Sequence, residues 1–289
     1  MTQNPFVKSF FESDTFTVSH VVSDLETKRA AIIDSVLDYD QASGRTTTQT
    51  ADTLIQYVES EGLGVDWVFE THIHADHLSA APYLLDKVGG KLAIGKRVSE
   101  VQAVFGDVFD AGQKFTPDGS QFDHLFADGE YFKLGNIDAK AISTPGHTPA
   151  CTVFKIGDAA FVGDTLFMPD FGTARCDFPG GDAETLYQSI QKIFALPDET
   201  RLFMCHDYKA PGRDEYVWET TVGEQKAKNI HVGHQATQAE FVKMRTERDA
   251  KLSMPKLILP SVQVNMRAGH FPEPASNGIR YLKIPLNAV

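Results

Sequence analysis

The sequence has few cysteines, and this scarcity limits the chemistry the chain can use. Its three cysteines, Cys151, Cys176 and Cys205, are too few and too scattered for a disulfide framework, and none forms a C-x-x-C pair. We therefore expect a reducing compartment and cysteines that serve packing. No disulfide or cysteine nucleophile is required by anything else in the sequence.

Long hydrophobic runs are also missing. No apolar stretch approaches the ~18 residues that would indicate a membrane span. The start of the chain, Met1 to Phe6, has no basic segment followed by an apolar one, so it does not resemble a secretory signal. These absences predict a soluble, cytoplasmic protein without a membrane partner.

Basic residues are outnumbered by acidic ones. Against 39 Asp and Glu the chain has 27 Lys and Arg, which gives a net charge of -12. This balance argues against a nucleic-acid partner and against an anionic membrane surface. Any anionic ligand must be bound by locally placed arginine or lysine. The 289 residues permit one large domain or two small ones, and a 42% share of hydrophobic residues can build a sizeable core.

One short stretch, Thr71 to His77, is rich in metal-ligating side chains. It contains three histidines and one aspartate within six residues, and it follows an apolar run, Val65 to Phe69, that reads as a buried strand. Residues two apart in an extended segment project to the same side, so His72 and His74 can approach one point. Imidazole and carboxylate groups in one short loop are typical of sites for first-row divalent metals.

The remaining hydrophobic pattern predicts an α/β fold with two sheets packed face to face and helices outside them. The predicted strands are Thr15 to Val22, Ala30 to Ile33, Val65 to Phe69, Lys91 to Ile94, several short ones between Phe122 and Phe167, and Arg201 to Met204. The predicted helices are one through Leu54, Tyr57 and Val58, then Ala80 to Lys87, Val98 to Val108, and Ala183 to Phe194.

The last quarter of the chain consists of a polar segment followed by a proline-containing tail. Glu224 to Lys251 is polar and helix-prone, and we interpret it as a solvated surface helix with Phe241 and Met244 at helical spacing. Pro255 to Val289 contains prolines and short apolar segments that predict strands. This tail must pack on the body of the protein to be ordered.

Three further candidate ligands lie at predicted strand ends. His147 follows the strand Ala139 to Ile142, and Asp164 directly follows an apolar strand, where a carboxylate is costly unless it is paired or bound to a metal. His206 ends the strand that begins at Arg201. With the first cluster this makes five histidines and two aspartates, enough for two metals or for one metal with supporting groups.

These motifs together resemble the metallo-β-lactamase superfamily. The ordered set is His72-Ile73-His74-Ala75-Asp76-His77, then Gly146-His147-Thr148, Gly163-Asp164-Thr165 and His206. The resemblance spans about residues 15 to 230. It implies an αβ/βα sandwich with the metals at one edge, and we expect 1–289 to form a single domain of this fold with 224–289 as a C-terminal extension packed on it.

Within that superfamily the chain most resembles the persulfide dioxygenases, relatives of the ethylmalonic encephalopathy protein, and next glyoxalase II. The finer marks are Thr71 to His77, Ala174-Arg175-Cys176-Asp177-Phe178, His206-Asp207-Tyr208 and Asn265-Met266-Arg267-Ala268-Gly269. In glyoxalase II the residue after the final histidine is typically glutamate, whereas here it is Asp207.

The resemblance implies one Fe(II) per chain, held by His72, His147 and Asp164. Two histidines and one carboxylate on one face leave positions open for substrate and oxygen. His74, Asp76, His77 and His206 would then support the ligands or handle protons, although hydrolases of the superfamily use such residues to bind two zinc ions. We expect Tyr208 to donate its hydroxyl near the site, and Arg175 and Arg267 to bind the anionic substrate.

The predicted function is oxidation of glutathione persulfide by dioxygen and water to sulfite and glutathione, and a homodimer is the candidate assembly. The alternative is a glyoxalase II-like dinuclear zinc hydrolase of a thioester or lactone, in which Asp164 bridges the ions and the metals lower the pKa of water toward ~7. A third hypothesis is a non-catalytic metal- or persulfide-binding sensor that docks a partner through the helix Gln235 to Lys251.

Overall fold

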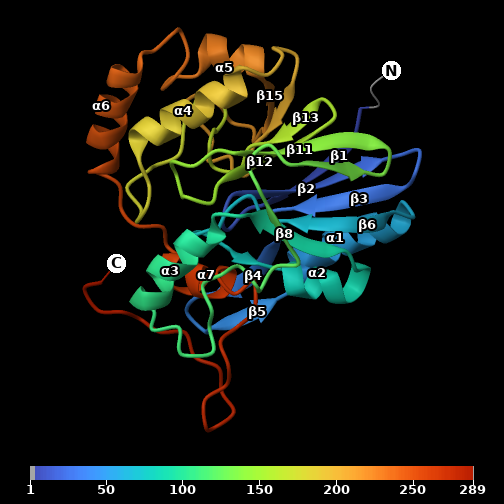
Figure 1. The fold of residues 1–289 in the computed structure, drawn as a ribbon, viewed down its shortest axis with the longest axis vertical. Helices are drawn as coiled ribbons and strands as arrows, with labels where there is room; N and C mark the ends of the chain where they lie inside the picture. Colours follow the sequence, from blue (N-terminus) through green and yellow to red (C-terminus); the bar gives the residue numbers. More distant parts are fainter. Residues whose placement is uncertain (1–3, 289) are drawn as a thin grey trace.

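The computed structural model describes residues 4–288 and consists of two six-stranded sheets packed face to face, with helices on both outer sides (Figure 1). The elements are β1 (Phe6–Glu12), β2 (Thr17–Asp24), β3 (Arg29–Ile33), β4 (Val36–Asp40), β5 (Arg45–Thr47), α1 (Gln49–Ser60), β6 (Gly64–Phe69), β7 (Leu78–Ser79), α2 (Ala81–Val88), β8 (Lys91–Gly95), α3 (Val98–Val108), β9 (His124–Phe126), β10 (Tyr131–Leu134), β11 (Ile137–Ser143), β12 (Thr152–Ile156), β13 (Ala159–Phe161), α4 (Ala183–Phe194), β14 (Arg201–Phe203), β15 (Glu219–Thr221), α5 (Val222–Lys228), α6 (Gln238–Asp249) and α7 (Ile258–Asn265). The predicted fold class is confirmed.

Both large sheets are mixed. The first has the order β1-β2-β3-β6-β8-β9, antiparallel from β1 to β3 and parallel from β3 to β9. The second has the order β10-β11-β12-β13-β14-β15 and is antiparallel except for the pair β13 and β14. A small sheet, β5-β4-β7, lies beside them.

The hydrophobic core has three layers. Between the sheets, Phe69 of β6 stacks on Phe154 of β12 with ring centroids 4.2 Å apart. Outside the first sheet, α1, α2, α3 and α7 bury side chains such as Leu54 and Leu84 against it. Outside the second sheet, α4 and α6 bury Leu186 and other apolar side chains. Because both sheets are covered on both faces, their strands are largely apolar.

The structure corrects several expectations about the elements. The sequence predicts a helix directly after the second strand, but β4 and β5 intervene, and β1 precedes the predicted first strand. The residues of β5 are polar and all exposed, so this strand has no hydrophobic signal, whereas β1 contains Phe6, Val7, Phe10 and Phe11, an apolar signal that the prediction missed. The predicted helix start at Ala80 is close to the observed α2, although Leu78 and Ser79 form the short strand β7.

The C-terminal quarter also differs from the prediction. Residues 255–288 contain the helix α7 and no strand; Pro260 lies in the first turn of α7, where its missing N–H costs little. The polar helix α6 is not simply solvated, because Phe241, Arg245 and Asp249 are buried on one face. Across residues 4–288, no helix combines the length and the apolar character that crossing a bilayer requires.

Candidate metal centre

Seven metal-ligating side chains lie where strands of both sheets end. His72, His74, Asp76 and His77 follow β6 of the first sheet. The other three come from the second sheet, where His147 follows β11, Asp164 follows β13 and His206 follows β14. The structure thus brings together all seven residues that the sequence motifs singled out, from segments more than 130 positions apart.

Gly163 lets two of these segments approach each other closely. Its φ of +51° is a conformation that side chains rarely adopt. A Cβ at this position would lie 2.5 Å from Thr71 Oγ1 and 2.8 Å from Thr71 Cβ, closer than real contacts allow. Glycine therefore allows Asp164 to reach the loop that carries His72.

The first group of ligands consists of His72, His147 and Asp164. Their ligand atoms lie within 4.8 Å of one another, and all three side chains are buried. The Nε2 atoms of His72 and His147 are 3.8 and 3.7 Å from Oδ2 of Asp164. These separations are too long for hydrogen bonds, so the three groups face one another without being bonded.

Two hydrogen bonds determine which ring nitrogen of each histidine faces this point. Thr71 Oγ1 donates to Asp34 at 2.9 Å, so it accepts from Nδ1 of His72 at 3.0 Å. Nδ1 of His147 donates to the Arg175 carbonyl oxygen at 2.7 Å. In both rings Nε2 is therefore left with a lone pair directed at the site, which is the arrangement that metal-binding histidines use.

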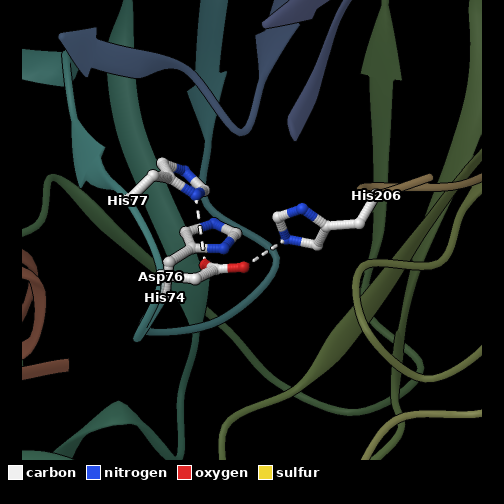
Figure 2. A group of neighbouring side chains, drawn as sticks. All are labelled: His74, Asp76, His77 and His206. Carbon is white, nitrogen blue, oxygen red and sulfur yellow. Dashed lines mark ion pairs between the residues drawn. The ribbon is translucent and has the colours of Figure 1, made fainter. Parts of the chain in front are cut away.

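The second group consists of His74, Asp76, His77 and His206, and Figure 2 shows their side chains converging. The Asp76 carboxylate lies between two of the rings, 3.0 Å from Nε2 of His206 and 3.3 Å from Nδ1 of His77. Nδ1 of His206 donates to the Phe16 carbonyl oxygen at 3.3 Å. The ion pair between His206 and Asp76 therefore joins the two halves of this group.

Unpaired buried nitrogens indicate that the site fits a cation. Nε2 of His72, Nδ1 of His74 and Nε2 of His77 are buried and have no hydrogen-bonding partner among residues 4–288. Buried polar atoms in folded proteins are nearly always paired. Imidazole nitrogens and the Asp164 carboxylate are suitable donors for iron or zinc. A divalent metal ion at the first group would satisfy His72 and Asp164, and the nitrogens of His74 and His77 would need a second cation at the other group.

The pKa shifts divide the histidines into neutral rings, which can act as ligands, and protonated ones. Burial lowers the pKa of His72 well below its usual value and that of His77 to about 4, so both are neutral at pH 7 and can act as ligands. Burial raises the pKa of Asp164. Although burial opposes it, the carboxylates of Asp76 and Asp164 raise the pKa of His206 to about 9.

Two buried carboxylates that the motifs did not include, Asp34 and Glu70, contact His74. Nε2 of His74 lies 3.0 Å from Oδ1 of Asp34 and 3.1 Å from Oε2 of Glu70. Asp34 also accepts hydrogen bonds from the backbone and hydroxyl of Thr71. Burial alone would lower the pKa of His74, but these carboxylates hold it well above its usual range. Asp34 could have been found, because it ends the apolar strand β3 just as Asp164 ends β13.

A cavity of about 1290 Å³ opens onto the centre. His147, Asp164 and Asp76 contribute to its lining, and so does Tyr208, whose hydroxyl donates to Oδ2 of Asp76 at 3.3 Å. Arg175 also lines the cavity, but its guanidinium already donates to Asp177 and to the Ser253 carbonyl oxygen and lies over a phenylalanine ring.

Arg267, expected to bind substrate, lies outside the cavity lining. Its guanidinium donates to the carbonyl oxygens of Gln263 and Ala111 at 2.6 and 3.3 Å and lies 5.0 Å from the Phe115 ring centroid. Its position therefore supports packing of the C-terminal segment, and nothing in its surroundings supports contact with substrate.

The cysteines are buried and free, as the sequence suggested. Burial raises the pKa of Cys151 and of Cys176 to about 12, so both remain thiols at neutral pH. A buried thiol is a poor nucleophile. The chemistry of the site therefore falls to the histidines and carboxylates.

Comparison with known proteins agrees with this geometry. A probable metallo-hydrolase of Burkholderia pseudomallei is 55% identical over 98% of this chain and 99% of its own length. Glyoxylase B2 of Dictyostelium discoideum is 49% identical over 99% of both chains. The mitochondrial persulfide dioxygenase ETHE1 of Bos taurus is 30% identical over 91% of this chain and 88% of its own.

Solved structures show the same fold. The crystal structure of ETHE1 from Myxococcus xanthus superposes with a TM-score of 0.72 at 28% identity, covering 92% of this chain and all of that one. The family model of the metallo-beta-lactamase superfamily matches residues 14–206, which contain all seven candidate ligands. This chain belongs to the metallo-β-lactamase superfamily.

Proposed function

We propose that the chain is a persulfide dioxygenase that converts glutathione persulfide, dioxygen and water to glutathione, sulfite and two protons at one Fe(II). The similarity to the persulfide dioxygenase of Bos taurus extends over 91% of the chain. A ferrous ion would supply the redox chemistry through which dioxygen oxidises the outer sulfur of the persulfide. The protein supplies ligands, orientation and proton transfer.

The observation that carries this proposal is the contrast between the two groups of ligands. Nε2 of His72 and of His147 faces Asp164 at 3.8 and 3.7 Å, with no hydrogen bond between them. In the second group the Asp76 carboxylate already lies 3.0 Å from His206 and 3.3 Å from His77, whereas Nδ1 of His74 and Nε2 of His77 are unpaired there. His72, His147 and Asp164 would hold an ion through two imidazoles and a carboxylate, a ligand set that non-haem iron oxygenases use to leave room for substrate and oxygen.

In this proposal the second group handles protons. Persulfide oxidation releases two protons, and the Asp76 carboxylate, with its pKa lowered well below the usual value by His206 and His77 despite burial, stays ionised. Tyr208 donates to Asp76 from the cavity wall and connects this carboxylate to bound substrate. Tyr208 and Asp76 would orient bound substrate and pass its protons to solvent through the cavity, because His206, with its pKa at about 9, is already protonated at pH 7 and cannot accept them.

Three free cations in the cavity support an anionic substrate. The side chains of Arg45, Arg248 and Lys256 line it and are exposed, and none forms an ion pair with another part of residues 4–288. The same lining also contains the carboxylates of Asp14, Asp38 and Asp40, so the cavity offers partners for charges of both signs. Glutathione carries two carboxylates and one ammonium, and Asp14 in the same lining could accept the ammonium.

The second candidate is a dinuclear hydrolase. It is favoured by the second group, whose four ligand atoms also lie within 4.8 Å of one another, and by the name of the Burkholderia relative, a probable metallo-hydrolase. Two zinc ions would then be held by the two groups, with Asp164 shared. A thioester or lactone would be the substrate.

Metal analysis and oxygen uptake separate these two functions. We expect anaerobically purified protein to contain about one iron per chain and to consume oxygen with glutathione persulfide, releasing sulfite. Two zincs per chain with thioester or lactone hydrolysis would favour the hydrolase. Iron-loaded protein that consumes no oxygen would reject the dioxygenase, and binding of metal without turnover of either substrate class would favour the sensor.

A further inference from the structure

The side chain of Asn265, the last residue of α7, contacts the loop that carries four of the candidate ligands. Its Oδ1 accepts from the Ser79 backbone N–H at 2.8 Å. Its Nδ2 donates to the carbonyl oxygens of His74 and His77 at 2.9 and 2.8 Å. Asn265 is buried, so one side-chain amide makes three hydrogen bonds to three backbone groups of this segment.

These bonds replace a secondary structure that the loop lacks. Residues 72–77 form no helix or strand, so their backbone carbonyls have few partners within the segment. Asn265 fixes the carbonyl groups on both sides of Asp76, and thereby the direction in which Asp76 and the neighbouring rings point. Side-chain amides that replace backbone hydrogen bonds specify one loop conformation, because an unpaired buried carbonyl is costly.

Asn265 lies outside the region that matches the metallo-β-lactamase family model. That match ends at residue 206, whereas α7 spans Ile258–Asn265 and packs against β7, next to the loop. The C-terminal segment therefore contributes directly to the geometry of the site. The sequence motif Asn265 to Gly269 includes this residue, but the catalytic proposal gives it no role.

We propose that Asn265 is a positioning residue of the metal centre, whose amide holds the His74–His77 turn in the conformation that binds metal. This inference rests on the proposed metal site but not on which reaction the metal serves. Outer partners of metal ligands typically change metal affinity by about 10–100-fold when they are replaced.

The same helix provides a closely matched control. Gln263, two residues earlier and also buried, accepts from the Lys283 backbone N–H at 2.8 Å and donates to the carbonyl oxygens of Leu259 and Lys283 at 2.7 and 2.9 Å. Its amide makes the same number of bonds to backbone groups, but none to the metal loop. Asn265→Asp and Gln263→Glu each remove the donor NH₂ with almost no change of shape.

The test is Co²⁺ binding by the full chain, measured by competition with a chelator and by the visible absorption of the bound ion. We expect Asn265→Asp to lower Co²⁺ affinity about 10–100-fold and to change the absorption bands, and Gln263→Glu to leave both within about threefold of the original protein. Thermal unfolding of both variants measures the purely structural cost.

Equal affinities in the original protein and Asn265→Asp would overturn the inference, and so would an equal loss in Gln263→Glu. If Asn265→Asp does not fold, Asn265→Ser, which keeps one donor, replaces it, and its Co²⁺ affinity is compared with that of the original protein and of Gln263→Glu in the same way. An original chain that binds no metal would reject the metal centre itself. Metal binding without oxygen uptake would reject only the dioxygenase.

Discussion

Arg245 and Asp249 form an ion pair one turn apart on α6, and both side chains are buried, with exposed fractions of 1% and 4%. Nε of Arg245 donates to Oδ1 of Asp249 at 2.8 Å. The pair also holds the loop beside the metal centre, because Arg245 donates to the Thr173 carbonyl oxygen at 3.0 Å and Asp249 accepts from the Cys176 N–H at 2.9 Å. Between these two points lies the Arg175 carbonyl that orients His147.

Breaking this pair should strongly destabilise the fold. Asp249→Ala leaves the Arg245 guanidinium buried without its counter-charge, and we expect a loss of about 3–5 kcal/mol of unfolding free energy, measured by urea denaturation. As a control, Arg97→Ala removes an exposed pair with Glu100 and should cost less than about 1 kcal/mol. Similar losses in the two variants would contradict the structural role of the buried pair.

The double variant Arg245→Met, Asp249→Leu tests how much of this loss of unfolding free energy comes from the hydrogen bonds that the pair makes to the backbone. Replacing a buried ion pair by apolar residues is often neutral when nothing else depends on it. Here the Thr173 carbonyl and the Cys176 N–H would lose their partners. We therefore expect the double variant to recover only part of the stability. Full recovery would show that these two backbone bonds contribute little.

Removal of one proposed iron ligand should abolish iron binding and leave the fold intact. In His147→Ala the Arg175 carbonyl loses its donor and the site loses one of its three donors, so we expect iron content to fall from about one per chain to near zero. His124→Ala, a partly exposed histidine paired with Glu130, is the control and should retain iron. Full activity in His147→Ala would remove His72, His147 and Asp164 as the iron site.

The convergence of the seven candidate ligands could be predicted from the sequence, for a physical reason. Candidate ligands at His147, Asp164 and His206 each follow a short apolar strand, and strands of packed sheets end at common edges. A carboxylate directly after a buried strand is costly without a partner, which made Asp164 informative. Their convergence with His72 could therefore be inferred without coordinates.

What the sequence did not reveal is mostly polar and buried. Arg245 and Asp249, four residues apart on a polar helix, look like a solvent-exposed pair, because a hydrophobicity pattern cannot record that one charge neutralises another. Arg267 was assigned to substrate because arginine binds anions, although it packs on Phe115. The roles of Glu70 and Asn265 depend on contacts that only the folded chain brings together.

Substrate affinity should depend on the free cations of the cavity. Arg248→Ala removes one charge available to a glutathione carboxylate, and hydrogen bonds to charged groups contribute about 1.5–3 kcal/mol. We expect the KM for glutathione persulfide to rise about tenfold or more with kcat nearly unchanged. Lys133→Ala removes an equal charge far from the lining and should leave KM unchanged. Equal KM values in the two variants would argue against this binding site.

Acid should destabilise the protein through His20, a histidine outside the metal centre that links the two sheets. His20 lies on β2, and its Nε2 donates to the Met204 carbonyl oxygen at 3.0 Å while Nδ1 contacts Ser9 Oγ at 2.9 Å. Burial lowers its pKa from 6.5 to about 4, even though the Met204 carbonyl and Asp34 act in the opposite direction. The folded protein therefore holds this ring neutral at pH values where the unfolded chain protonates it.

The sign of the effect follows from this difference. Between pH 4 and 6.5 the unfolded chain binds more protons at His20 than the folded protein does, so stability is complete above about pH 6.5 and declines as the pH falls toward 4. At ~1.4 kcal/mol per pKa unit, the contribution of His20 is about 3 kcal/mol. His20→Gln can still donate to the Met204 carbonyl but cannot be protonated in this range. Urea denaturation from pH 4 to 7 should therefore show a shallower decline in the variant than in the original protein, whereas parallel curves would mean that His20 is not a source of acid sensitivity.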